Sequence, residues 1–184
     1  MKSQDVIKSL RKRHGTTGAA AEWAFFEELR LGTGYQSTKE KAIGINPEQR
    51  LDAWAINLYP SNKFLKVTYE VKVSRSDFLH EIKHPEKRQQ GLWVSNEFYF
   101  VTPAGLVERK EVPTECGLIY VYDNDRSRLI VRAPLRKTDD YATWRFFASI
   151  ARRTATAEQE IVNLKVSQNY NKDVSNANYH KSPS

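Results

Sequence analysis

The sequence predicts one α/β domain built on a mixed β-sheet. Residues 51–59 and 64–73 are two strand-like segments joined by a short polar turn, which indicates an antiparallel hairpin. Residues 97–101 and 117–122 are short apolar runs typical of buried strands. Helical patterns occur before, between and after these strands. A length of 184 residues, of which 40% are hydrophobic, fits a single globular domain.

A basic arm and one helix are expected before residue 35, followed by a strand fragment and a loop over residues 35–50. Residues 1–14 are rich in Lys and Arg and form a basic arm, either as a short helix or as a frayed segment. Residues 19–31 place Ala20, Trp23, Ala24, Glu27 and Leu31 at helical spacing, which predicts a helix. Glycines at 32 and 34 would end it.

The strands follow. Residues 64–73 alternate apolar and polar side chains, as expected for a half-buried strand. The turn before it, residues 60–63, contains Pro60, Ser61 and Asn62, which favour turns. Residues 129–132 are predicted to form an edge strand after the polar turn at 123–125.

Two further helices complete the prediction. Residues 76–93 are charged and helical, with an interruption expected at Pro85. Residues 138–164 form a long helix with Thr138 as a plausible N-cap, and this helix would either pack on the sheet or serve as a homodimer face. Residues 165–184 are polar and are expected to be a disordered tail, so the domain proper spans 15–164.

Composition and charge narrow the classes of function that the chain can have. The formal net charge of +7 favours a polyanionic partner, nucleic acid first, although a merely basic soluble protein has the same balance. No apolar run is long enough to span a membrane, and no apolar segment follows the basic N-terminus as in a secretory signal. The single cysteine, Cys116, excludes an internal disulfide framework and a cysteine-based zinc cluster. A cytoplasmic protein is the simplest interpretation.

Two acids and a lysine are expected to meet at one end of the hairpin. Asp52 lies at the head of the first strand, and Glu70, Val71 and Lys72 end the second. Because strand residues alternate faces, Glu70 and Lys72 point the same way and Val71 points to the core. Such a set could hold Mg²⁺ beside a scissile phosphate, with Val71 offering its backbone carbonyl and Lys72 touching the phosphate or orienting the water. The same residues are also compatible with an ordinary Glu–Lys pair on a strand surface.

The order of elements around this motif resembles the PD-(D/E)XK nuclease superfamily. Within it, the chain is most similar to the MmcB-type branch of DNA-repair-associated nucleases. The similarity rests on residues 70–72, the serine-rich run at 73–78, and the stretches 98–103 and 113–119. It implies a restriction-endonuclease-like three-layer core, with a central mixed sheet flanked by helices, and metal-dependent hydrolysis of DNA. Leu51 replaces the proline that usually precedes the aspartate.

The resemblance also implies roles. Asp52 and Glu70 would bind Mg²⁺, for which Mn²⁺ can substitute, and Lys72 would be the catalytic lysine. A supporting glutamate from the first helix is expected at Glu22, with Glu27 and Glu28 as competitors. The family's glutamine on the helix after the lysine corresponds to Gln89 or Gln90.

Other residues after the motif suggest a nucleic-acid surface. Arg75, Lys87 and Arg88 could follow a DNA backbone, or they could lie on a solvated helix face. His80 and His84 are four residues apart, but without an HExxH pattern zinc binding is not favoured. The sequence has no glycine-rich phosphate loop, so no small-molecule cofactor beyond the metal is expected.

The leading hypothesis is therefore a Mg²⁺-dependent DNA nuclease. Its rivals are a non-catalytic DNA-binding module and a protein that binds a nuclease partner, both on the same fold.

Overall fold

A computed structural model describes residues 1–15, 22–32, 48–138 and 144–179, with side chains in the last stretch described through residue 168. The chain divides into two compact units, Met1–Ser149 and Ile150–Ser184. The first unit is an α/β fold around a six-stranded mixed sheet, as the sequence predicts. The elements in chain order are α1 (Ser3–Arg13), β1 (Trp23–Arg30), β2 (Arg50–Asn57), η1 (Pro60–Asn62), β3 (Lys66–Val71), α3 (Arg75–Lys83), α4 (Glu86–Trp93), β4 (Glu97–Pro103), η2 (Arg109–Glu111), β5 (Gly117–Val121), β6 (Ser127–Val131) and α5 (Trp144–Tyr179).

The sheet has its strands in sequence order, β1 to β6. The first three form an antiparallel meander. β4 then pairs with β3 in parallel and β5 with β4 in parallel, and β6 returns antiparallel. The parallel step from β3 to β4 is made by α3 and α4, because parallel neighbours need a crossover connection.

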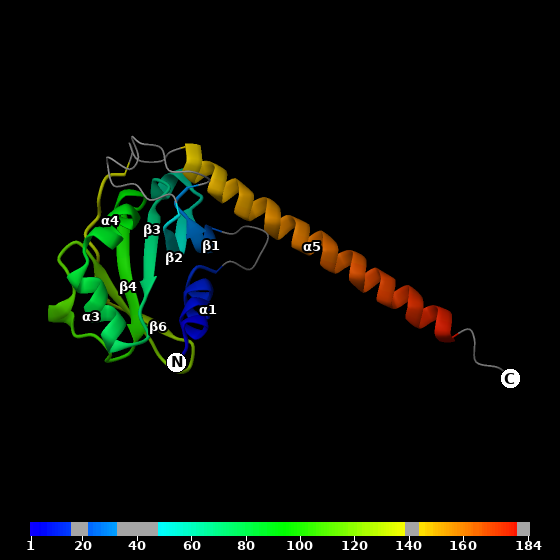
Figure 1. Ribbon diagram of the computed structural model, residues 1–184, viewed down its shortest axis with the longest axis horizontal. Coiled ribbons are helices and arrows are strands. Elements are labelled where there is room, and N and C mark those ends of the chain that lie inside the picture. Colours follow the sequence, from blue (N-terminus) through cyan, green and yellow to red (C-terminus); the bar gives the residue numbers. More distant parts are fainter. Residues whose placement is uncertain (16–21, 33–47, 139–143, 180–184) are drawn as a thin grey trace. The chain divides into compact units, whose positions relative to one another are not determined.

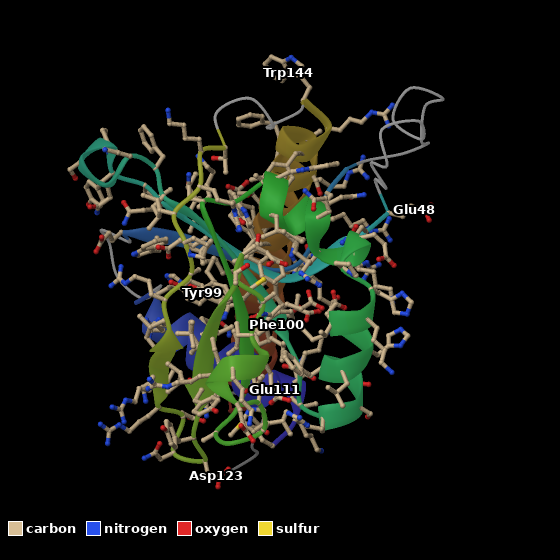
Figure 2. The ribbon with its side chains drawn as sticks, turned by 90° about the vertical axis from the view of Figure 1, so that its left-hand side faces the viewer. Glu48, Tyr99, Phe100, Glu111, Asp123 and Trp144 are labelled. Carbon is tan, nitrogen blue, oxygen red and sulfur yellow. The ribbon has the colours of Figure 1, made fainter. Side chains whose placement is uncertain are left out.

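Helices cover both faces of this sheet (Figure 1). On one face, Val6 and Leu10 of α1 pack against the odd-numbered residues of β3 and β4, such as Tyr69 and Val101. On the other face, Phe78 of α3 packs against the even-numbered residues of β4, and Figure 2 shows Phe100 surrounded by side chains at the centre of the sheet. The alternation of side chains along β4 therefore separates two cores, with Tyr99 and Val101 in one and Phe98 and Phe100 in the other.

The predicted hairpin is present. β2 and β3 pair in antiparallel register, and the turn between them is the short helix η1. Pro60 begins this turn, where its fixed φ is favourable, and Lys63 ends it in the left-handed region.

The N-terminal arm is a helix that belongs to the domain. α1 buries Val6 and Leu10 completely. At its end, His14 lies against Trp23 and its ring nitrogen Nε2 is 2.6 Å from the hydroxyl of Tyr69. Of the two alternatives for residues 1–14, the short helix is therefore correct.

The helix predicted at 19–31 is wrong over its described part, because residues 23–30 form the edge strand β1. Residues 19–21 lie outside the described residues. The segment WAFFEELR has both a helical spacing of apolar residues and the aromatic content typical of strands. Pairing with β2 decides between them, since the backbone of β2 needs a partner on this side.

The helix predicted at 76–93 is present as two helices, α3 and α4, and Pro85 marks the break. α3 begins one residue after Ser74, whose hydroxyl accepts a hydrogen bond from the Asp77 N–H at 3.2 Å. This is the N-cap arrangement that satisfies an otherwise free backbone donor.

The C-terminal helix is longer than predicted. α5 runs from Trp144 to Tyr179, so the prediction of a disordered tail is wrong for residues 165–179, and 180–184 lie outside the described residues. The predicted first turn, 139–143, also lies outside them. No Gly or Pro occurs between 144 and 179, so polar composition alone did not end the helix. Among the described residues, no helix combines the length and the apolar character needed to cross a membrane.

Candidate active site

Asp52 and Glu70 lie at the open end of the β2–β3 hairpin. The register pairs Ala53 with Tyr69, which places Asp52 and Glu70 one step further along, on adjacent strands and on the same face. The Asp52 carboxylate oxygen Oδ2 accepts a hydrogen bond from the backbone N–H of Val71 at 2.8 Å. The predicted meeting of the two acids is therefore present, and a backbone hydrogen bond fixes the orientation of Asp52.

Lys72 follows directly after β3. Its backbone N–H donates to the carbonyl of Val101 at 3.0 Å, which continues the ladder to β4. This holds Lys72 in extended geometry two residues after Glu70, on the same face. Its Nζ lies 2.7 Å from Oε1 of Glu70, and the side chains are only 15% and 20% exposed.

A third carboxylate, Glu81, approaches the same lysine. It comes from α3, its side chain is 7% exposed, and its Oε2 is 3.5 Å from Nζ of Lys72. The sequence analysis missed this residue by treating the segment as a charged surface. The spacing contained the signal, since Phe78 and Ile82 lie three residues before and one after Glu81, on the helix face that packs on the sheet.

Burial raises the pKa of both strand carboxyls. For Glu70, burial and the negative charge of Asp52 raise the pKa from 4.5 to about 7, against the opposing effect of Lys72. For Asp52, burial raises the pKa, while the Val71 N–H and the Lys72 ammonium oppose the increase. Crowded, poorly hydrated carboxyls of this kind favour either a proton or a cation.

Lys72 remains a cation. Burial lowers its pKa, but Glu70, Glu81 and Asp52 together outweigh that effect, and the net pKa is raised. A lysine with a raised pKa stabilises negative charge and is unsuited to act as a general base. Three carboxylates surround this one ammonium group, so the cluster has an unbalanced negative charge when all three are ionised.

The cluster offers few protein ligands for Mg²⁺. Among the described residues, no group of three His, Cys, Asp or Glu side chains is arranged to hold a metal ion. Mg²⁺ does not require one, because it is usually bound through one or two carboxylates while it keeps several waters. Asp52 and Glu70, with the backbone of Val71 between them, meet that requirement.

A cavity of about 150 Å³ adjoins Asp52 and Val71. The first turns of α1 line one side, and Glu27 and Glu28 of β1 line another. Glu28 has a positive φ of 47°, and it lies between the β1–β2 pairs formed by Glu27 and Leu29, opposite Asp52. A non-glycine residue in this region is strained, and such residues concentrate at functional sites.

Glu22 lies away from this site, so its predicted role is wrong. The first helix is α1, whose sequence SQDVIKSLRKR contains no glutamate. Glu22 precedes β1, and its Oε1 accepts hydrogen bonds from the side-chain amides of Asn57 at 2.8 Å and Asn62 at 3.1 Å. Asn57 ends β2, at the end of the strand opposite to Asp52. Its competitors Glu27 and Glu28 are the glutamates that border the cavity beside Asp52.

The four predicted nucleic-acid contacts divide into two groups. Two have structural partners: Arg75 donates to Glu111 at 2.7 Å, and the buried Arg88 donates to Glu115 at 2.7 Å. Lys87 and Gln89 are exposed on α4. The Nζ of Lys87 lies 3.2 Å from Nε2 of His80. Arg75 is exposed as well, but its guanidinium is engaged by Glu111, so Lys87 and Gln89 are better placed for a phosphate contact.

Comparison with known proteins supports the fold. No protein-family model matches the chain, and no curated protein matches it. Among solved structures, the chain is similar to the SPO1766 protein of unknown function from Silicibacter pomeroyi. The TM-score is 0.59 at 19% sequence identity, over 91% of this chain and 94% of that chain. A likeness at this identity shows a shared α/β fold with a mixed sheet.

Proposed function

We propose that this chain is a metal-dependent nuclease that hydrolyses phosphodiester bonds in DNA. The observation that carries the proposal is the pairing of Asp52 with Glu70 across β2 and β3, with the Lys72 ammonium 2.7 Å from Glu70. The order of one helix, three antiparallel strands, two helices and a parallel strand supports it, because it agrees with the resemblance to PD-(D/E)XK nucleases.

The residues have separable tasks. Asp52, Glu70 and the backbone carbonyl of Val71 would hold Mg²⁺, which supplies a polarised phosphate and a more acidic water when bound. Asp52 is oriented by the Val71 N–H, and Lys72 is oriented by Glu70 and Glu81. As a permanent cation, Lys72 stabilises the negative charge that increases on the phosphate in the transition state.

DNA is the proposed substrate because of charge. The chain has a formal net charge of +7, and Lys87 and Gln89 are exposed on the helix pair that follows the motif. Lys87 would contact phosphate, and such contacts give affinity without sequence specificity. We place this activity in the cytoplasm. A chain with a single cysteine cannot form an internal disulfide and therefore does not require an oxidising compartment.

The test is cleavage of plasmid, single-stranded, duplex and branched DNA with Mg²⁺, with Mn²⁺ and with EDTA. Lys72→Met and Asp52→Asn are expected to reduce the cleavage rate about 100-fold or more. Lys66→Met is the matched control, since Lys66 lies on the same face of β3 at its other end. Circular dichroism of each variant would show that the fold is retained.

Cleavage that survives EDTA, or that persists in Lys72→Met, would contradict this function. The second candidate is a non-catalytic DNA-binding module, favoured by the ion pairs that already engage Lys72. Its signature is salt-sensitive, metal-independent DNA binding with no product on any substrate. Stoichiometric binding to a protein, without affinity for DNA, would instead support an interaction protein.

A further inference from the structure

The helix α5 has one exposed apolar row with the spacing of a coiled coil. Phe147, Ile150, Thr154, Ala157, Ile161 and Leu164 alternate at intervals of three and four residues. Phe147 is 55% exposed, Ile161 52% and Leu164 63%, and Ile150 is half-buried. In heptad terms, Phe147, Thr154 and Ile161 take position a, and Ile150, Ala157 and Leu164 take position d.

Other rows on the helix are interrupted by charges. Val162 and Val166 are also exposed, at 52% and 63%. With Val162 at position a, Glu158 and Lys165 would fall at position d. With Val162 at position d, Arg152 and Gln159 would fall at position a. A charge at position a or d disrupts a seam, and the row from Phe147 to Leu164 has no charged residue at either position.

The charges that flank this seam have no partner of opposite sign along their own helix. Arg153 and Glu160 take position g, and Glu158 and Lys165 take position e. None of the four has an opposite charge three or four residues away, where a pair within one helix would form. Among the described residues, no ion pair uses any of them.

Each charge finds its complement on a second parallel copy. In a parallel coiled coil, a residue at g faces the residue at e five positions later on the other helix. Arg153 would then face Glu158 of the second copy, and Glu160 would face Lys165. Both pairs have opposite sign in a single register, and two-fold symmetry repeats each of them.

We propose that α5 joins two copies of this chain as a parallel, in-register, two-stranded coiled coil over Phe147 to Leu164. A β-branched residue at position a and leucine at position d, as in Ile161 and Leu164, favour two strands over higher states. Gln168 at the next position a ends the apolar seam. The proposal does not depend on nuclease activity.

A charge-exchange experiment on the full chain tests the pairing. Glu160→Lys places two lysines opposite each other, and Lys165→Glu places two glutamates there. Each single variant is expected to weaken the dimer about tenfold in sedimentation equilibrium. An equimolar mixture of the two variants should recover the affinity, because each chain then offers the complement of the other.

A monomeric wild-type chain at high concentration would overturn the proposal. So would single variants that dimerise as tightly as the wild type, or a mixture that shows no recovery. Circular dichroism of each variant establishes that α5 is still helical, so weakened association cannot be assigned to unfolding.

Cross-linking tests the orientation. Ala157 at position d faces its own counterpart only in a parallel, in-register pair, so Ala157→Cys is expected to form a disulfide-linked dimer on mild oxidation. Ala155→Cys, at the outer position b, is the matched control and should not cross-link. The natural Cys116 is buried and does not compete. Absence of the Ala157→Cys dimer, or equal cross-linking of the control, would overturn the parallel arrangement.

Discussion

At the scale of single residues, the fold holds the carboxyl of Glu70 at the end of the β2–β3 hairpin, where its charged form is disfavoured. Glu70 keeps a lysine at 2.7 Å, and yet its pKa is raised to about 7. Burial and the neighbouring Asp52 outweigh the favourable contact. A carboxyl in this state reduces the stability of the folded chain at neutral pH, which is typical of a group retained for function.

Glu70→Gln is therefore expected to stabilise the metal-free protein at high pH. Between pH 4.5 and about 7, the folded state binds a proton that the unfolded state has lost, so the wild type loses stability as pH rises through this range. The variant has no carboxyl at position 70, so its stability does not decrease for this reason as the pH rises. The free energy of unfolding of Glu70→Gln minus that of the wild type should be larger at pH 8 than at pH 5, by roughly 1–3 kcal/mol.

Urea unfolding in EDTA at the two pH values measures this difference. Asp123→Asn is the control, because Asp123 is an exposed carboxyl in the turn after β5 (Figure 2), outside the buried cluster. A difference for Glu70→Gln that does not change with pH would show that the carboxyl is not forced toward its neutral form.

The sequence predicted this pair of acids and Lys72, but not Glu81. Asp52 and Glu70 could be found because period-two alternation and one turn suffice to bring them together. Glu81 could not be assigned by the same argument, because its approach to Lys72 depends on how α3 docks on the sheet. Glu22 was misplaced because its assignment depended on a helix that is a strand in the fold.

At the scale of elements, β2 and β3 were correctly predicted as strands, because β3 alternates apolar and polar side chains and a clear turn separates it from β2. β1 was wrongly predicted as a helix. Its apolar residues satisfy both periods over a short stretch, and only the pairing partner β2 separates the two. The close approaches between elements were also invisible in sequence. Gly91 of α4 and Gly117 of β5 each lie where a side chain would meet a neighbouring strand.

Gly117→Ala is expected to destabilise the protein more than Gly91→Ala. At Gly117, an added Cβ would strike the ring of Tyr99 and lie 2.7 Å from the backbone nitrogen of Ala133, which cannot move aside without shifting its segment. At Gly91, the nearest atoms belong to side chains, with Phe98 Cε2 at 2.9 Å.

Overpacking of this kind costs about 1–3 kcal/mol, and in a helix alanine recovers up to about 1 kcal/mol relative to glycine. We therefore expect a loss near the upper figure for Gly117→Ala and a smaller loss for Gly91→Ala. Urea unfolding curves of the two variants at one pH provide the comparison. An equal or reversed order would mean that β5 can move away from β4 more easily than the contacts indicate.

At the scale of the whole molecule, the chain combines a complete α/β unit with a helix that continues beyond it. Composition suggested a tail, because residues 165–184 are rich in Asn, Ser and Lys. That reasoning failed for residues 165–179 because polar residues without Gly or Pro can extend a helix already begun by stronger helix formers. Whether such a helix has a partner depends on a second chain, which no single sequence describes.

Truncation after Ser149 tests this division. All six strands lie in Met1–Ser149, and so does Phe146, whose ring packs edge-on against the buried Trp54 at a centroid distance of 5.2 Å. The shortened chain is therefore expected to unfold cooperatively, with a urea midpoint close to that of the full chain measured at low concentration. It should lose helical circular dichroism and, because the seam is removed, any concentration-dependent association. A shortened chain that is unfolded or aggregated would show that Ile150–Ser184 supports the α/β unit, and that the two parts are not independent.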